Sequence, residues 1–405
     1  MAQYDLLITC PTLNAEFFLQ KLIFGTFLFI TLNKNFGPKP HFCVAPTVVR
    51  HLKTEVYLMK YCLIIIAFLY LVSCQTNGQK NQDEEFDLSL NIDSIISGQK
   101  FNGVILVSAD STDIYSKAIG FSDLENGTKL DVKDQFVIGS ISKQITAVLV
   151  LREYEKENLE LDDSIGKYLT QINQPWTKEV TIHHLLTHTH GIIDLNKPLE
   201  FEQGSQFHYS QLGYELLAQI LEKVTEKSFE QLSTELFENY GLKNTFHPNN
   251  KKYKHLVKGY EETENGVLAF AANSLDNYVP AGGFISNAAD LKKWNENLYS
   301  GKLVAKETLQ LMTTKYATRI HPIFETVEYG YGLLFKDGEQ NIQIGALGYA
   351  PGFVSACYYY PQENLNLVIL ENTANNLDDF KQTFKIHTEI MELIKKRTHN
   401  NTYKQ

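Results

Sequence analysis

The stretch that decides the fold of this chain is FVIGSISKQITAVLVLREY, residues 136–154. It contains Ser140 and Lys143, three residues apart, and an apolar run at 145–151 that is long enough for a buried helix. Because residues three apart share one face of a helix, the serine hydroxyl and the lysine amine are predicted to lie side by side at its first turn. A helix N-terminus also offers unpaired N–H groups and a partial positive charge, which suits a serine that loses a proton beside an oxyanion.

This spacing predicts an activated serine, although it also has a simpler explanation. A buried ammonium loses hydration and can then act as a proton acceptor for a neighbouring hydroxyl. The alternative is that Ser140 caps the helix while Lys143 lies in solvent. Since Ser-x-x-Lys occurs by chance in most long chains, other segments have to decide between the two interpretations.

Length, charge and cysteine content limit the possible classes of protein. The 405 residues suffice for one large domain or two ordinary ones. A formal net charge of −10 argues against a nucleic-acid partner, which calls for a basic face. The five cysteines fit no zinc spacing, and only Cys357 lies in the body of the chain, which therefore cannot form an internal disulfide.

The first 74 residues differ from the rest. Residues 1–58 mix apolar, proline-rich and basic pieces without a clear period. Residues 59–74, MKYCLIIIAFLYLVSC, join a short positive start to an apolar run of about a dozen residues, which is typical of a signal peptide. This run is shorter than the roughly 20 residues of a membrane-spanning helix. The final LVSC resembles the bacterial lipobox, so Cys74 is the predicted lipidation site.

We therefore expect translation to start at Met59, with residues 1–58 as a non-native extension from a mis-assigned start. The alternative is a longer, membrane-anchored N-terminus. Residues 75–100 are predicted to be a tether, because they begin with a polar run, and residues 101–397 the folded domain. This organisation indicates a protein lipid-anchored to a membrane of the bacterial cell envelope, on the periplasmic or the cell-surface face.

Regular structure is predicted on both sides of the central stretch. Strands at 101–110 and 112–120 precede it. Helices at 181–188, 212–224 and 228–238 follow it. The remaining elements are a helix capped by Ser286 or Asn287, single strands at 329–337, 341–361 and 365–373, and a last helix at 377–396.

Four histidines occur in TIHHLLTHTHG, residues 181–191, and His184 and His188 are spaced to share one ligand face. The segment fails the His-x-His-x-Asp-His zinc signature because residues 192–193 are both isoleucine, and Leu185 replaces the glutamate of zinc proteases. We predict no metal and no cofactor. A zinc hydrolase that chelators inactivate is the alternative.

Tyr209 stands directly before the periodic helix at 212–224. A phenol held beside an ammonium can serve as a general base, which makes Tyr209 a candidate for that role. The alternative is an aromatic side chain that only packs against the start of the helix.

Five segments, in order along the chain, together resemble the serine β-lactamase-like family of class C β-lactamases, D-alanyl-D-alanine carboxypeptidases and esterases. The resemblance covers residues 101–394. The segments and their family counterparts are IGSISKQITA (138–147; the Ser-x-x-Lys helix), LLTHTHGI (185–192; LLTHTSG), FHYSQLGYELLAQILEKVT (207–225; Tyr-Ser-Asn-x-Gly-Tyr), VPAGGFISNAADLKKW (279–294; AGGL-x-S-x-x-D) and IGALGYAPGF (344–353; GHTGGTPGF).

The resemblance implies an α+β, β-lactamase/transpeptidase-like fold. An antiparallel sheet flanked by helices would carry an inserted, mostly helical region at about 160–310. It also implies that Ser140 attacks a carbonyl, that Lys143 and Tyr209 share the proton transfers, and that an acyl-enzyme forms. Backbone N–H groups of Ser140 and Tyr349 would hold the oxyanion, each contributing about 3 kcal/mol to transition-state stabilisation.

Two departures from the family pattern concern substrate binding. Gln211 stands where the family has Asn, and it keeps the amide but moves it by one methylene. Ala346 stands where the family has Lys or His, so the cation that would face a substrate carboxylate is absent. Gly348 remains, and with it the adjoining backbone donor.

We therefore expect a serine hydrolase of esterase or D-amino-acid peptidase type, acting on a small-molecule or peptidoglycan-like substrate. The alternative is a catalytically weak, ligand-binding envelope protein of the same fold, which Ala346 and Gln211 favour and the intact Ser140, Lys143 and Tyr209 disfavour. No oligomeric state follows from the sequence.

Chromogenic cephalosporins test the departure at Ala346. Since β-lactams and D-alanyl-D-alanine peptides carry the carboxylate that this position no longer faces, both are expected to be poor substrates and a neutral ester or amide a better one. Turnover of a cephalosporin at the rate of a dedicated β-lactamase, measured by absorbance, contradicts this expectation.

Overall fold

The computed structural model describes residues 87–272, 277–336 and 343–402. The predicted extension at 1–58, the signal peptide at 59–74, Cys74 and the first part of the tether lie outside the described residues. None of the helices in the described part of the chain combines the length and the apolar character needed to cross a membrane.

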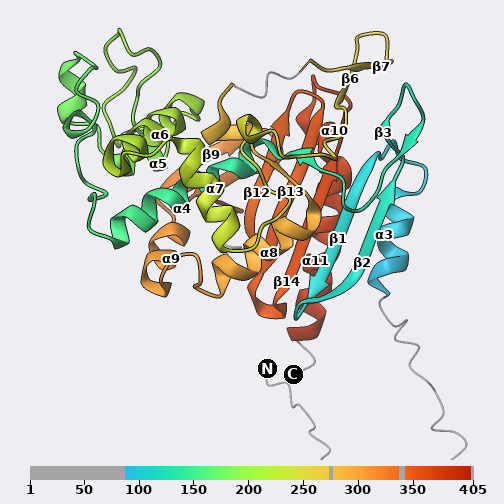
Figure 1. The fold of residues 1–405 in the computed structure, drawn as a ribbon. Coiled ribbons are helices and arrows are strands. Elements are labelled where there is room, and N and C mark those ends of the chain that lie inside the picture. Colours follow the sequence, from blue (N-terminus) through green and yellow to red (C-terminus); the bar gives the residue numbers. More distant parts are fainter. Residues whose placement is uncertain (1–86, 273–276, 337–342, 403–405) are drawn as a thin grey trace, which may run out of the picture. The chain divides into compact units, whose positions relative to one another are not determined.

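The centre of the fold is an antiparallel sheet that joins the two ends of the described chain (Figure 1). The strand that comes first in sequence pairs with the last long one, with Gly103 opposite Glu371. In sheet order the strands are β2 (Thr112–Ile119), β1 (Gly103–Ala109), β14 (Leu365–Glu371), β13 (Phe353–Tyr360), β12 (Ile344–Ala350), β11 (Leu334–Lys336), β10 (Glu325–Tyr329) and β9 (Ala317–His321).

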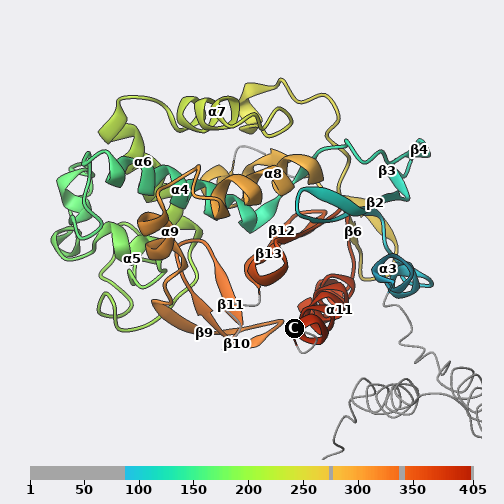
Figure 2. The ribbon, with the colours of Figure 1, turned by 90° about the horizontal axis from the view of Figure 1, so that it is seen from below.

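Helices cover both faces of this sheet (Figure 2). Successive side chains of a strand point to opposite faces, and β1 therefore contributes to two cores. Val104 and Leu106 pack in the core that includes α4 and α8, whereas Ile105 and Val107 pack in the core that includes α3 and α11. The helices on the sheet are α3 (Leu88–Ile96), α4 (Ser142–Glu155), α8 (Ala288–Tyr299), α10 (Phe380–Thr383) and α11 (Lys385–Thr402).

The remaining helices form the predicted insertion between the early and the late strands. They are α5 (Ile182–Leu186), α6 (Gln211–Thr225), α7 (Phe229–Asn239) and α9 (Lys306–Thr313). Short strands form three small sheets apart from the main one: β3 (Phe121–Asp123) with β4 (Thr128–Lys129), β5 (Phe136–Val137) with β8 (Ile285–Ser286), and β15 (Thr373–Ala374) with β6 (Tyr260–Glu262) and β7 (Leu268–Phe270). The predicted α+β class is confirmed.

Two predictions about the late strands are wrong. The strand expected at 329–337 is only β11, because residues 330–333 form the turn between β10 and β11. The stretch 341–361, expected as one strand, is the hairpin of β12 and β13, which turns at residues 351–352. Gly352 has φ +79°, which favours glycine, and an added Cβ would lie 2.7 Å from the Cα of Gly259. Strands β9 and β10 were not predicted at all.

The predicted tether is also wrong in its second half, because residues 88–96 form helix α3. Asp87 caps it by accepting hydrogen bonds from the N–H groups of Ser89 and Leu90. Leu88 and Ile92 are four residues apart and both are buried, so they present one apolar stripe to the core. The polar run that indicates a tether ends before this stripe begins.

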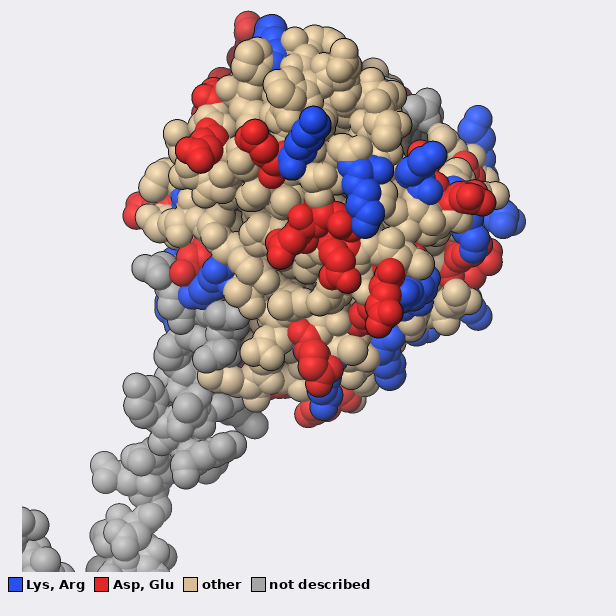
Figure 3. Space-filling model, turned by 90° about the vertical axis from the view of Figure 1, so that its left-hand side faces the viewer, with Lys and Arg blue, Asp and Glu red and all other residues tan. Residues whose placement is uncertain are grey.

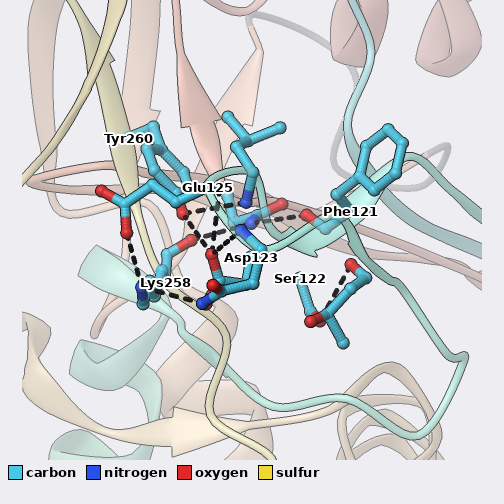
Figure 4. A network of polar contacts seen from close by, with 10 residues as sticks. Phe121, Ser122, Asp123, Glu125, Lys258 and Tyr260 are labelled. Carbon is cyan, nitrogen blue, oxygen red and sulfur yellow. Dashed lines mark hydrogen bonds and ion pairs between the residues drawn. The ribbon is translucent and has the colours of Figure 1, made fainter.

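A polar network fastens the β3–β4 hairpin to the segment before β6 (Figure 4). The Lys258 ammonium lies 2.9 Å from a carboxylate oxygen of Asp123 and 2.7 Å from one of Glu125. The Tyr260 hydroxyl accepts a hydrogen bond from the N–H of Leu124 at 2.9 Å. The network therefore joins two loops that lie far apart in the sequence.

A pair of substitutions in α3 tests whether this helix belongs to the folded domain. Ile92→Ala removes a side chain that is 0% exposed, and we expect the free energy of unfolding to fall by about 2–4 kcal/mol. Leu90→Ala, on the same helix at 68% exposure, should change it by less than about 0.5 kcal/mol. Urea unfolding measures both, and two equally small effects would show that α3 does not contribute to the domain's stability.

Candidate active site

Ser140 lies in the turn that leads into α4. Residues Gly139–Ile141 form a 3-10 turn and the α-helix begins at Ser142, so the serine stands just before the helix rather than inside its first turn. Gly139 has φ +54°, and an added Cβ would lie 2.5 Å from the backbone nitrogen of Tyr349. Only glycine fits this approach, and it brings Ser140 against strand β12.

Lys143 is buried beside the serine, as the spacing predicts. Its side chain is 2% exposed, and its Nζ lies 3.3 Å from the Oγ of Ser140. The same Nζ donates a hydrogen bond to the carbonyl oxygen of Ala281 at 2.6 Å. The alternative of a lysine in solvent is therefore wrong.

Tyr209 reaches the same hydroxyl from the other side. Its OH donates a hydrogen bond to Ser140 Oγ at 2.7 Å. The Lys143 Nζ lies 4.7 Å from the centre of the Tyr209 ring. Ser210 follows and caps α6 by accepting a hydrogen bond from the N–H of Gly213. Ser140 Oγ is thus in hydrogen-bond contact with both an amine and a phenol.

The ring of His188 packs against the ring of Tyr209. Its ring centre lies 4.6 Å from that of Tyr209, and its Nδ1 accepts a hydrogen bond from the N–H of Ser210 at 3.2 Å. Complete burial lowers the pKa of His188 well below its usual value, so the ring is neutral at pH 7 and can accept this bond. Its Nε2 lies 3.1 Å from the hydroxyl of Tyr329.

The other histidines of this segment have separate partners. His183 lies 2.8 Å from the hydroxyl of Tyr331, His184 takes part in the capping box of α5, and His190 accepts a hydrogen bond from the N–H of Ile192. Within the described ranges, no group of three or more His, Cys, Asp or Glu is placed to hold a metal ion. The arrangement that the zinc-hydrolase alternative requires is therefore not found there.

Strand β12 passes directly beside the serine turn. An added Cβ at Gly348 would collide with the carbonyl oxygen of Ile138, which also accepts a hydrogen bond from Ser355 Oγ at 2.9 Å. The side chain of Tyr349 is held by Glu261, which accepts its OH at 2.6 Å and the N–H of Gly352 at 3.2 Å. Residues 348–349 are thus fixed against the turn that carries the nucleophile candidate.

A cavity of about 220 Å³ opens over these groups. All six residues expected in the site line it: Ser140, Lys143, Tyr209, Gln211, Gly348 and Tyr349. A neighbouring cavity of about 460 Å³ shares Gln211 and Tyr349 with the first, and Asn277 and Tyr278 also line it. The cleft therefore continues past Gln211 and Tyr349 into the second cavity.

Arg319 is a residue of this cavity that the sequence did not reveal. It projects from β9, and its guanidinium carbon lies 5.1 Å from the centre of the Tyr209 ring. One signal was present in the sequence. Because Ala346 removes the usual cation of the site, another cation could have been sought, and the chain has only four arginines. Without β9 in the predicted sheet, nothing placed Arg319 near the serine.

The charged side chains described in the lining of this cavity are all positive. Its described lining residues include two cations, Lys143 and Arg319, and no Asp or Glu. Burial and the nearby arginine lower the pKa of His321, another lining residue, to about 3, so this ring is neutral at pH 7. By contrast, both signs of charge lie interspersed on the face shown in Figure 3.

The chain is similar to several known proteins. A family model described as beta-lactamase matches residues 90–390. Teichoic acid D-alanine hydrolase of Staphylococcus aureus is 25% identical over 279 residues, which cover 64% of this chain and 68% of the relative.

Solved structures share the fold. The octameric penicillin-binding protein homologue from Pyrococcus abyssi has a TM-score of 0.62 at 26% identity, over 70% of this chain and 72% of its own. The D-amino acid amidase from Ochrobactrum anthropi SV3, complexed with D-phenylalanine, has a TM-score of 0.67 at 19% identity, over 77% and 99%. The similarity spans the sheet and its helical insertion together.

Proposed function

The chain belongs to the beta-lactamase family, and from this premise we propose that it is a serine hydrolase with Ser140 as its nucleophile. It cleaves an ester or amide bond through an acyl-enzyme. The observation that carries the proposal is the environment of one atom: Ser140 Oγ has the Tyr209 hydroxyl at 2.7 Å and the Lys143 amine at 3.3 Å. Two groups that exchange protons therefore reach the hydroxyl that must lose one.

The first half of the reaction forms the acyl-enzyme. Ser140 Oγ bonds to the substrate carbonyl carbon while its proton passes to the oxygen of Tyr209, which reacts as the phenolate beside the Lys143 ammonium. The negative carbonyl oxygen is held by the backbone N–H groups of Ser140 and Tyr349. When the intermediate collapses, the bond to the leaving oxygen or nitrogen breaks, and Tyr209 returns a proton to that atom.

The second half releases the acid. Tyr209 takes a proton from a water molecule, whose oxygen bonds to the acyl carbon. The bond to Ser140 Oγ then breaks, and the serine regains its proton. Lys143 remains bound to the Ala281 carbonyl, which keeps its amine directed at the serine.

We propose that the acyl group is a D-amino acid, and that it lies in the cavity lined by Asn277 and Tyr278. The relatives support this, since one acts on D-alanine of teichoic acid and another on D-amino acid amides. The amides of Gln211 and Asn277 in this cavity offer hydrogen-bond partners to an amino acid. The substrate is then a component of the cell envelope, which agrees with a lipid anchor at Cys74.

A fluorophosphonate probe tests the nucleophile. We expect the wild-type chain to be labelled and Ser140→Ala to be unlabelled. Lys143→Ala should react about 100-fold more slowly or worse, because proton transfer from the serine is lost. Lys178→Ala is the control, since Lys178 is exposed, and it should react like the wild type. Absence of labelling in the wild type would instead favour the ligand-binding alternative.

A pair of enantiomers tests the acyl group. If the cavity beside Gln211 takes a D-amino acid, D-alanine methyl ester should be hydrolysed at least about tenfold faster than the L-enantiomer, the order expected when one mirror image leaves a hydrogen-bonding group unpaired. The rates can be followed by release of acid. Equal rates in an enzyme whose Ser140 is labelled would refute the acyl assignment and leave the hydrolase assignment intact.

A further inference from the structure

Arg319 is a half-buried cation that has no ionic partner among the described residues. None of the carboxylates described by the structure lies within 4.0 Å of it as an ion pair, whereas many surface lysines have one. Its one hydrogen bond is from Nε to the carbonyl oxygen of Ile320, at 3.4 Å. A half-buried charge left in this state is costly unless something else compensates it.

Aromatic rings supply part of that compensation. The guanidinium carbon lies 5.1 Å from the centre of the Tyr209 ring and 5.3 Å from that of Phe207, which is the geometry of a cation–π contact. A guanidinium has five N–H donors, and among the described residues only the Nε of Arg319 has an acceptor. Burial lowers the pKa of Arg319, but arginine remains charged in proteins.

The position of Arg319 relative to the reacting atoms identifies the part of the substrate that meets it. Tyr209 must protonate the leaving atom, so the leaving group departs along the Tyr209 side of the cleft. Arg319 lies on that side, and it also lines an outer groove with Phe207, His208 and Ile320. A leaving group that extends from the serine to solvent therefore passes the guanidinium.

We propose that Arg319 is a specificity residue that binds an anionic group, phosphate or carboxylate, carried by the leaving group of the substrate. The proposal rests on the hydrolase function proposed above and names the substrate class more closely: an ester or amide whose alcohol or amine part is negatively charged. The planar guanidinium suits either anion, since it donates two parallel hydrogen bonds to a pair of oxygens.

This arrangement moves the cation of the site to another strand. The family pattern has it at position 346 on β12, whereas Arg319 stands on β9, three strands further along the sheet. A flexible leaving group can bring its anion to the new position. A bicyclic β-lactam holds its carboxylate rigidly beside the scissile bond, so the expectation of slow cephalosporin turnover stands.

Binding to a variant without the nucleophile tests the proposal independently of turnover. We would titrate Ser140→Ala with glycerol 3-phosphate, glycerate and glycerol by NMR, because the three share a skeleton and differ in charge. We expect one or both anions to bind at least about tenfold more tightly than glycerol, the order of a charge-assisted hydrogen bond. Whichever anion binds better identifies phosphate or carboxylate as the group.

Matched charge removals make the test specific to Arg319. Adding Arg319→Gln to Ser140→Ala should abolish the preference for the anions, whereas adding Lys178→Gln, which removes an exposed charge, should keep it. Equal binding of the anions and glycerol, or a preference that survives Arg319→Gln, would overturn the proposal. These outcomes hold even if the fluorophosphonate experiment fails.

Turnover then separates substrate binding from an effect on Tyr209. With D-alanyl esters of glycerol and glycerol 3-phosphate, we expect the ratio of kcat/KM, charged over neutral, to be about ten or more and to fall to about one in Arg319→Gln. If both esters lose rate by the same factor, the ratio is unchanged, and Arg319 acts through Tyr209 rather than on the substrate. That result would also overturn the proposal.

Discussion

The buried ammonium of Lys143 is the constraint on which the rest of the site depends. A charge at 2% exposure is stable only if its donors are bonded, and the carbonyl oxygen of Ala281 provides the shortest of these bonds. That carbonyl is available because residues 279–283 form a single π-helical turn after Tyr278, which has φ +53°. The preceding carbonyl, of Pro280, accepts the hydroxyl of Thr146 one turn further along α4. The segment 279–283 therefore supplies hydrogen-bond acceptors to two side chains of α4.

Local features of the sequence predicted much of the fold. Strands β1 and β2 and the caps Thr181 and Asn287 depend on neighbouring residues and were predictable. The same is true of the adjacency of Ser140 and Lys143, since it follows from helix geometry alone. Tyr209 joined them only through the family resemblance, because its contact with Ser140 spans 69 positions of sequence.

Other features could not be predicted because they depend on distant pairing. Strand β9 reads as polar and irregular, with exposed Thr318 and Ile320, and is fixed only by its partner β10. Because β9 was not predicted, Arg319, which lies on it, was not predicted in the site either. The hairpin of β12 and β13 is a different case, because Pro351-Gly352 between its arms is a local turn signal that could have divided the stretch. It was expected as one strand because both arms are buried and apolar.

The two departures from the family pattern, Gln211 and Ala346, are residues that line the cleft. The groups in contact with Ser140 Oγ, from Lys143 and Tyr209, are those that the family pattern requires, and Gly348 of that pattern is also present. Gln211 and Ala346, by contrast, line the cleft, and no hydrogen bond among the described residues joins either of them to the serine hydroxyl. A chain that was losing catalysis would have no reason to keep the first group intact, since a buried lysine without a task is a cost to stability. The differences therefore point to a change of substrate rather than to loss of the reaction, and the cation beside Tyr209 indicates where that change lies.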